Sequence, residues 1–242
     1  LIVISTFIFG WNLPLTATQI LVINILMDGP PAVALGVEKK HGNVMSRPPR
    51  PVDEGLPNKG DIWLIFYLGA VMVTGTLMVF FLAGGGIETC EGLPLAQEGS
   101  LPFDQELCNA GDADALSEWQ SYADDRFIHA QTMTLSVFIM FQLFNVMNCR
   151  SQEESIFSLG AFSNKAINIA FFVSFGLLLF FVQLANFSIP FTNFEIGGLL
   201  STKVLALSDW GIIIAVAFSV LVIEEFRKYI VNSELFAIKR TY

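Results

Sequence analysis

The hydrophobic residues of this chain are gathered in long runs that polar segments separate. A helix needs about 20 mostly apolar residues to cross roughly 30 Å of hydrocarbon. Four runs have this length, at residues 62–83, 128–147, 166–185 and 211–226 with its flanks. A fifth run, residues 17–37, is apolar but is interrupted by polar residues and by Gly29-Pro30-Pro31. The pattern therefore predicts five membrane-spanning helices.

Residues 1–9 form a further apolar stretch, which is too short to span a membrane alone. We interpret it as the second half of a helix, joined to the next span by a turn at residues 10–14. Only helices and closed barrels cross bilayers, and runs near 20 residues are too long for barrel strands. We therefore predict an all-α, polytopic membrane helix bundle with five full transmembrane helices plus the end of a sixth.

The distribution of charge gives this bundle an orientation. Cytoplasmic loops near membrane ends carry an excess of Lys and Arg. Residues 38–60, 149–165 and 227–242 hold 11 of the 13 basic residues, whereas residues 86–127 hold ten acidic residues and one basic residue. We therefore predict that residues 38–60 are a cytoplasmic loop, that residues 86–127 are an acidic extracytoplasmic loop, and that the C-terminus is cytoplasmic.

Composition agrees with a membrane protein and excludes two other classes. Charged residues make up 14% of the chain, against about 25% in soluble domains, which excludes an ordinary cytosolic enzyme. The net charge of −9 excludes a nucleic-acid binder, because such a protein needs a basic face. The expected surroundings are a lipid bilayer, and no nucleic-acid partner is expected.

The cysteine positions fit the predicted topology. Cys90 and Cys108 both fall in the predicted outer loop, where oxidising conditions permit a disulfide. Sequence alone leaves a bond and two free thiols equally open, because it does not test the geometry. Cys149 lies at an inner membrane end and is expected to stay reduced.

Asp28 stands near the middle of an apolar span, where an ionisable group is costly and points to function. Asn24 lies four residues earlier and so shares a helix face with Asp28. Pro30 and Pro31 remove backbone donors and free carbonyls of the preceding turn. Carboxylate, amide and carbonyl oxygens suit calcium or another hard cation, so Asn24 and Asp28 are candidate metal ligands. The alternative is a buried Asp28 that is hydrogen-bonded to a neighbouring helix.

The span at residues 128–147 also carries amides. Gln142 and Asn145 are three residues apart and share a helix face. For Asn145 and Asn148 we expect hydrogen bonds between helices, a common use of amides in membrane bundles. For Gln142 the same kind of hydrogen bond is the first interpretation.

Two further sets of residues have simpler interpretations. At the inner edge of the last span, two acidic residues beside two basic residues are expected to be a solvated charge cluster: Glu224, Glu225, Arg227 and Lys228. Glycines within the spans are expected to permit close helix packing: Gly69, Gly75 and Gly176.

The sequence around the candidate ligands resembles calcium-transporting P-type ATPases. Residues 19–36, QILVINILMDGPPAVALG, look like the sixth transmembrane helix of these pumps, and residues 45–50, MSRPPR, resemble the signature that follows it. The likeness covers essentially all of residues 1–242, as the C-terminal transmembrane domain from the end of helix five through helix ten. It implies that Asn24 and Asp28 bind the transported calcium ion.

Two residues match the plasma-membrane calcium pumps and not the two-site pumps of the sarcoplasmic reticulum. Met27 stands where the two-site pumps have a Thr ligand, and Gln142 stands where they have a ligand Glu. The resemblance thus implies one calcium per cycle, a weak ligand at Gln142 and a location in the plasma membrane.

The parts of such a pump that use ATP are expected outside this sequence. The phosphorylation motif Asp-Lys-Thr-Gly-Thr does not occur in it, and ATP and Mg²⁺ are expected to bind to separate cytoplasmic domains. The chain alone is expected to be inactive and to need the remainder of the pump, helices 1–5 and the cytoplasmic domains. The alternatives are a stand-alone, non-enzymatic regulatory or assembly membrane protein, or a pump for another cation such as sodium or manganese.

Overall fold

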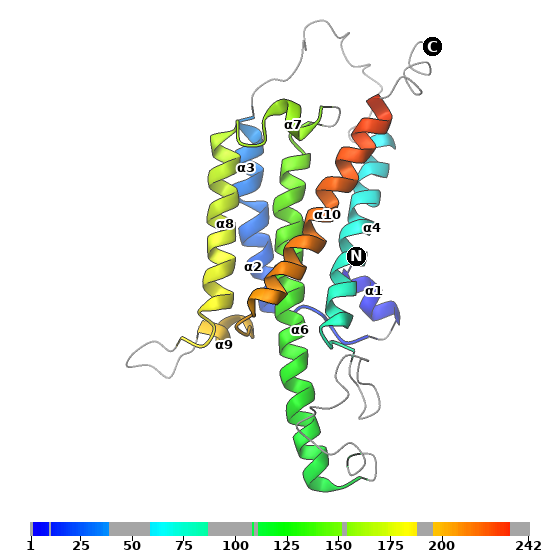
Figure 1. Ribbon diagram of the computed structural model, residues 1–242, viewed down its shortest axis with the longest axis vertical. Helices are drawn as coiled ribbons and strands as arrows, with labels where there is room; N and C mark the ends of the chain where they lie inside the picture. The colour runs from blue at the N-terminus through cyan, green and yellow to red at the C-terminus, as the bar shows by residue number, and fades with distance from the viewer. Residues whose placement is uncertain are drawn as a thin grey trace, which may run out of the picture.

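The computed structural model describes residues 2–9, 11–38, 59–86, 108, 111–151, 154–187 and 196–232. Within these ranges the regular elements are all helices, and five helical segments are long and apolar enough to cross a membrane. The predicted all-α membrane bundle is thus confirmed (Figure 1).

The helices follow the apolar runs closely. In chain order they are α1 (Ile2–Phe9), α2 (Ala17–Asp28), α3 (Pro30–Gly36), α4 (Lys59–Leu82), α6 (Ala113–Asn148), α7 (Ile156–Leu159), α8 (Lys165–Gln183), α9 (Ile196–Leu200) and α10 (Leu207–Asn232). The membrane-crossing segments are α2 together with α3, then α4, α6, α8 and α10.

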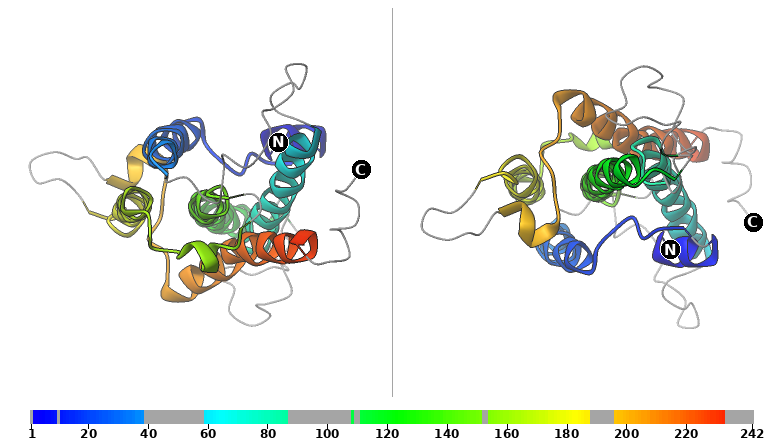
Figure 2. Two further views of the ribbon diagram at one scale, coloured as in Figure 1. Left: turned by 90° about the horizontal axis from the view of Figure 1, so that it is seen from above. Right: turned by 90° about the horizontal axis from the view of Figure 1, so that it is seen from below.

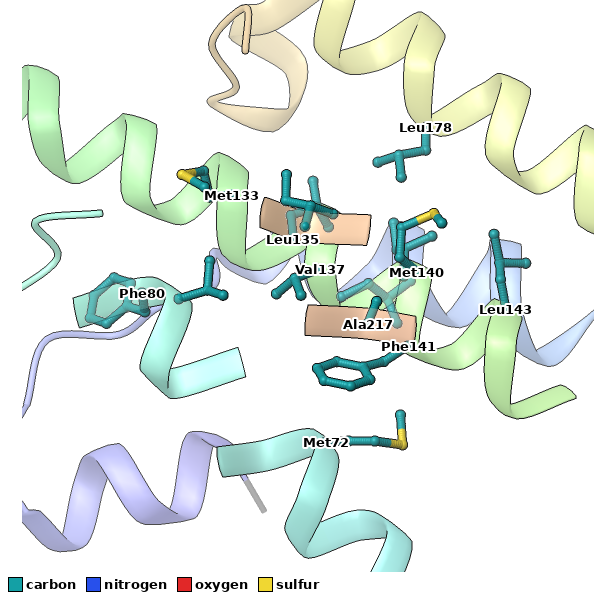
Figure 3. Packing of buried hydrophobic residues seen from close by; sticks show 14 of the residues in the cluster. Met72, Phe80, Met133, Leu135, Val137, Met140, Phe141, Leu143, Leu178 and Ala217 are labelled. Atoms are coloured by element: carbon teal, nitrogen blue, oxygen red, sulfur yellow. The ribbon is translucent and has the colours of Figure 1, made fainter. Parts of the chain in front are cut away.

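Helix α6 is the centre of the bundle. Seen along the bundle, α2 with α3, α8, α10 and α4 stand around it (Figure 2). Fully buried side chains of α6, such as Val137 and Phe141, fill the main hydrophobic core together with residues of α4 and α10 (Figure 3). Large apolar side chains such as Trp63 and Ile169 are exposed on the outside, as expected for a surface that faces lipid.

The predicted inner and outer segments adjoin opposite ends of the bundle. The end of α3, the start of α4, α7 and the end of α10 lie together at the upper end in Figure 1. The end of α4, the start of α6 and α9 lie toward the other end. A chain whose loops lie alternately on the two sides of a membrane requires this arrangement. Which end of the bundle faces the cytoplasm stays a prediction. Residues 39–58 and 87–107, most of the two predicted loops, lie outside the described residues.

Helix α6 begins well before its apolar run. Residues 113–127, predicted as part of the outer loop, are helical. Asp112 starts the helix, because its carboxylate accepts the N–H groups of Asp114 and Ala115 at 3.1 Å each. At 1.5 Å per residue, the helix is about 54 Å long, so its first turns project beyond the bundle (Figure 1).

The first span is broken in its middle, where the prolines interrupt the apolar run. Gly29 separates α2 from α3 and is not helical, with φ −82° and ψ −87°. Because proline has no N–H, Pro30 and Pro31 cannot donate to the carbonyls of Leu26 and Met27. The break therefore leaves two carbonyl oxygens at membrane depth without their usual helical donors.

The two halves of this span pack into different hydrophobic cores. Ile23 of α2 belongs to the main core around α6. Ala34 of α3 belongs to a second, smaller core, together with Met147 of α6 and Ile167 of α8. The break at Gly29 thus lies where the span passes from one packing unit to the other.

The packing role predicted for glycines holds for one of them. A Cβ atom at Gly75 of α4 would lie 2.6 Å from the ring of Phe141, so a side chain there would collide with α6. A Cβ atom at Gly176 of α8 would meet nothing within 4 Å, so the prediction is wrong for this residue. Gly69 lines two cavities, which are described below.

The described cysteines agree with the predicted topology. Cys108 is disulfide-bonded, and its expected partner, Cys90, lies outside the described residues. Cys149, directly after α6, is a free cysteine, as predicted.

Candidate functional site

Two of the three predicted site residues line the same cavity. Asn24 of α2 and Gln142 of α6 both border a space of about 320 Å³ between α1, α2, α4 and α6, here called the α2–α6 cavity. The other walls are largely apolar and include Met72 of α4 and Phe138 of α6. The fold thus brings together two amides that are far apart in the sequence.

Both amides are available to a ligand. Asn24 is exposed and Gln142 is half-buried, and within the described part of the chain neither side chain has a hydrogen-bond partner. A polar group in apolar surroundings is costly when it lacks a partner. A cation or water in the cavity would supply that partner to either oxygen.

Asp28, the third predicted residue, is the last residue of α2. Its side chain lies outside what the structure describes, so its role as a ligand stays a prediction. Asn24 lies about one helical turn earlier on the same helix. The carbonyls freed by Pro30 and Pro31 belong to the same turn as Asp28, which makes this turn rich in candidate oxygen ligands.

A second cavity of about 300 Å³ lies between α4, α6 and α10. It shares Gly69, Met72 and Gln142 with the α2–α6 cavity, so the two spaces meet at the same residues. Its polar lining consists of three amides and two carboxylates, from Gln142, Asn145, Asn148, Asp61 and Glu224. Gln142 therefore lies between the α2–α6 cavity and a polar space that extends to Glu224 of α10.

Glu224 corrects the prediction of a solvated charge cluster. Glu224 and Lys228 are each only 2% exposed. Glu224 is paired with Arg227 at 2.6 Å, and the Lys228 ammonium donates to the carbonyl of Asn148 at 3.3 Å. The helical spacing of α10 could have predicted this burial, because Glu224 and Lys228 continue the series of buried residues that recur every three or four positions. The series is Ile213, Ala217, Val220, Glu224 and Lys228.

The two asparagines near the end of α6 differ from each other. Asn148 donates from Nδ2 to the carbonyl of Val220 on α10 at 3.3 Å, which confirms the predicted hydrogen bond between helices. Asn145 makes no such bond among the described residues, and its Oδ1 atom is buried without a partner. The Oδ1 atom of Asn148 is likewise buried and unpaired.

The chemistry of the α2–α6 cavity is that of neutral oxygen donors. No group of three or more His, Cys, Asp or Glu side chains in the described ranges is placed to hold a metal ion. Calcium takes six to eight oxygen ligands, and two amides with the turn at Asp28 provide only part of such a set. A complete site in this cavity would need oxygen ligands in addition to Asn24 and Gln142.

Comparisons with known proteins point to one family. Residues 12–230 match the family described as "Cation transporting ATPase, C-terminus". The match covers every membrane-crossing segment and both amides of the α2–α6 cavity.

Individual relatives cover nearly the same region. The chain is 34% identical over 229 residues to calcium-transporting ATPase 1 of Schizosaccharomyces pombe, an alignment that covers 95% of this chain and 20% of that protein. It is 31% identical over 215 residues to calcium-transporting ATPase 1 of Saccharomyces cerevisiae, covering 89% and 18%. It is 32% identical over 166 residues to human calcium-transporting ATPase type 2C member 2, covering 68% and 13%. The chain thus spans a fifth or less of the length of these relatives.

Proposed function

Because the chain belongs to the family of cation-transporting ATPases and corresponds to their C-terminal part, we propose that it is the C-terminal membrane domain of an ATP-driven calcium pump. The relatives described above are named as calcium-transporting ATPases, which supports calcium as the transported ion. In this role α2 and α6 contribute cation ligands, and α4, α8 and α10 form the scaffold. The remainder of the pump binds ATP and Mg²⁺ and carries out phosphorylation.

The observation that carries this proposal is the placement of Asn24 and Gln142 on one cavity. Both are amides without partners in the described residues, and Asn24 lies about one helical turn before the break at Gly29. An ion that enters this space meets oxygen donors from two helices at once. Movement of α2 relative to α6 would then open or close the site, as transport requires.

The test is the calcium dependence of phosphorylation by ATP in the complete polypeptide that contains this chain. Asn24→Ala and Asp28→Asn should abolish calcium-dependent phosphorylation, because each removes an oxygen ligand or its charge. Gln142→Ala should weaken it. Wild-type calcium dependence in both Asn24→Ala and Asp28→Asn would overturn the site assignment.

A matched control separates loss of a ligand from loss of any amide. Asn168 of α8 is a half-buried amide whose Nδ2 atom donates to the carbonyl of Phe162 at 2.8 Å. It borders a separate, apolar cavity between α6, α8 and α10. Asn168→Ala should keep wild-type calcium dependence.

We further propose a pump of the plasma-membrane type that carries one calcium per cycle. Met27 and Gln142 support this proposal, because a thioether is a poor ligand for a hard cation and the amide of Gln142 carries no charge. Counting calcium bound per phosphorylation site tests the stoichiometry, and two ions per site would refute it. Since the relatives include a type 2C pump, an antibody against residues 231–242 should decide the location. Labelling of internal membranes alone would exclude the plasma-membrane type.

The second candidate is a stand-alone membrane protein without enzymatic activity. The same antibody distinguishes the two on an immunoblot of source membranes. A pump predicts a band several times larger than the 26.7 kDa of this chain. A native band near that mass, with proteolysis excluded, would favour the stand-alone protein or a pump split into two polypeptides.

The identity of the transported ion is tested by comparing how well different cations support phosphorylation by ATP. Calcium should support phosphorylation at lower concentrations than sodium or manganese if the proposal is right. Activation by sodium alone, or tighter activation by manganese, would assign the pump to another cation.

A further inference from the structure

Arg150 is a buried arginine two residues after the end of α6, and it does not line the α2–α6 cavity. Its side chain is 0% exposed. The guanidinium donates to both carboxylate oxygens of Glu38, from Nε to Oε2 at 3.2 Å and from Nη2 to Oε1 at 3.1 Å. This two-bond fork is the strongest form of an arginine–carboxylate pair.

The other donors of Arg150 hold the connection that leads from α6 to α8. Its Nη1 atom donates to the carbonyls of Gly160 and Ala161 at 3.0 and 3.1 Å. Its Nη2 atom donates to Ser163 Oγ at 2.6 Å. These contacts, together with Glu38, form what is here called the Arg150 clasp.

Asn164 closes the clasp from the start of α8. Its Oδ1 atom accepts the N–H groups of Ala166 and Ile167 and so caps α8. Its Nδ2 atom donates to Glu38 Oε2 at 2.5 Å. One carboxylate therefore receives bonds from the end of α6 and from the start of α8.

Lysine could not replace Arg150 here. The guanidinium is a planar fork with five N–H donors, whereas an ammonium group is a point charge with three. The bonds to Glu38, to two carbonyls and to a hydroxyl need donors that point in different directions. A buried charge also needs partners on every side, and the clasp supplies them.

Glu38 connects the Arg150 clasp to α3, the second half of the broken span. It lies two residues after the end of α3, and its N–H donates to the carbonyl of Leu35 at 3.0 Å. α3 packs along α8 and joins the second core through Ala34. The inner half of the span is thus fixed to α6 and α8, and Gly29 separates it from α2.

We propose that Arg150 is a positioning residue for the candidate cation site, which it serves by fixing α3 through Glu38. The turn that carries Asp28 directly precedes α3, so the position of α3 sets where that turn can lie. The inference rests on the proposed function, because the placement of the turn has a measurable consequence only if a cation binds there. Arg150 touches no candidate ligand and acts through α3.

The test measures phosphorylation by ATP against calcium concentration in the complete polypeptide. Arg150→Gln and Glu38→Gln should each raise the calcium concentration for half-maximal phosphorylation about tenfold, a change typical of coupled sites. The maximal phosphorylation level per folded molecule should stay near wild type. The double variant should match the single variants, because both remove the same attachment.

A gentler variant covers the case in which Arg150→Gln does not fold. Asn164→Ser keeps a side-chain oxygen that can cap α8 and removes the donor toward Glu38 without adding a charge. It should shift the calcium dependence in the same direction by a smaller factor. Lys203→Gln removes the exposed ion pair with Asp125 near the other end of the bundle and should leave the calcium dependence unchanged.

The outcomes separate a positioning role from a structural one. If all clasp variants lose thermal stability but keep the wild-type calcium dependence, Arg150 only stabilises the fold and the proposal is wrong. If the wild-type protein shows no calcium-dependent phosphorylation, the proposed function fails and this inference fails with it. If Asp28→Asn abolishes the response while the clasp variants leave its midpoint unchanged, only the inference about Arg150 fails.

Discussion

The α2–α6 cavity and the Arg150 clasp differ in whether their polar side chains have hydrogen-bond partners. In the cavity, Asn24 and Gln142 have no hydrogen-bond partner among the described residues. In the clasp, Arg150 donates to Glu38, to two carbonyls and to a hydroxyl, and its side chain is fully buried. Both sites adjoin the same broken span, one beside α2 and the other beyond α3.

This difference suits two different roles, binding a ligand in the cavity and stabilising the fold in the clasp. Polar groups that serve the fold are paired, because an unpaired buried group costs free energy. Polar groups that serve a ligand stay unpaired until the ligand arrives. Unpaired oxygens also occur at Asn145, Asn148 and Asn168, which line the other cavities. A missing partner therefore marks a cavity-lining amide, and only a binding experiment shows whether it is a ligand.

The largest effect on stability is expected when the Arg150 clasp is disrupted. Arg150→Ala should lower the free energy of unfolding by about 3–5 kcal/mol, because it leaves the Glu38 carboxylate without its charged partner. Asn24→Ala should change it by less than about 0.5 kcal/mol, since no contact within the described residues is lost. Thermal unfolding of the complete polypeptide in detergent measures both. Similar losses in the two variants would remove the distinction between the sites.

The next effect concerns α4, which borders the cavity and also packs on α6. Gly75→Ala should destabilise the fold by about 1–3 kcal/mol, because the new Cβ atom would lie 2.6 Å from the Phe141 ring. Gly176→Ala on α8 is the matched control, since its Cβ atom would meet nothing within 4 Å. It should be neutral or slightly stabilising. Equal gains at both positions would mean that helix propensity, not packing, governs these glycines, and equal losses would mean that the contact with Phe141 is not the cause.

Replacing Gln142 should change stability little but should clearly change calcium binding. Gln142→Leu should leave thermal stability nearly unchanged, because the amide has no partner to lose. It should lower calcium affinity about tenfold, or about 1.4 kcal/mol. Titration of calcium-dependent phosphorylation checks the affinity. Lost stability with unchanged affinity would assign Gln142 to the scaffold.

The smallest effect concerns the reactivity of Cys149, which also lines the second cavity. Cys149 has an exposed surface, while burial of its thiol and, next, the charge of Glu224 raise the thiol pKa. Because the thiolate is the reactive form, labelling by a maleimide should be slow at pH 7 and should accelerate as pH rises. The Cys149→Ser variant is the control for labelling elsewhere.

The same reagent tests the orientation of the bundle. A membrane-impermeant maleimide should label Cys149 from the cytoplasmic side, as in inside-out vesicles, and not from the outside. Labelling from the outside alone would reverse the predicted topology, including the cytoplasmic C-terminus.

The sequence predicts the spans well, because run length and charge asymmetry follow directly from the thickness and polarity of a bilayer. The break at Gly29 is equally predictable, since Pro30 and Pro31 lack the N–H donors that a continuous helix needs. The start of α6 is harder to find. Residues 113–127 are polar enough to resemble a loop, and the cap at Asp112 is a local signal that a search for apolar runs does not use.

The site is only partly predictable for a different reason. Asn24 can be chosen because it shares a helix face with Asp28, and Gln142 can be chosen from the resemblance to calcium pumps. Their shared cavity, however, depends on how α2 packs near α6. Glu224 looks solvated beside Arg227 and Lys228, although the spacing of the buried residues on α10 places it inside. The pairing of Arg150 with Glu38 joins residues that are distant in sequence and belong to segments both predicted at the inner edge. Tertiary packing alone brings them together.

The proposed function requires that the α2–α6 cavity holds the transported cation. Equilibrium binding of radioactive calcium to the purified complete polypeptide, without ATP, tests it most directly. The wild type should bind one calcium per phosphorylation site, and an Asn24→Ala/Gln142→Leu variant that keeps its thermal stability should show no saturable binding. Undiminished calcium binding in that folded double variant would contradict the claim and place the ion elsewhere.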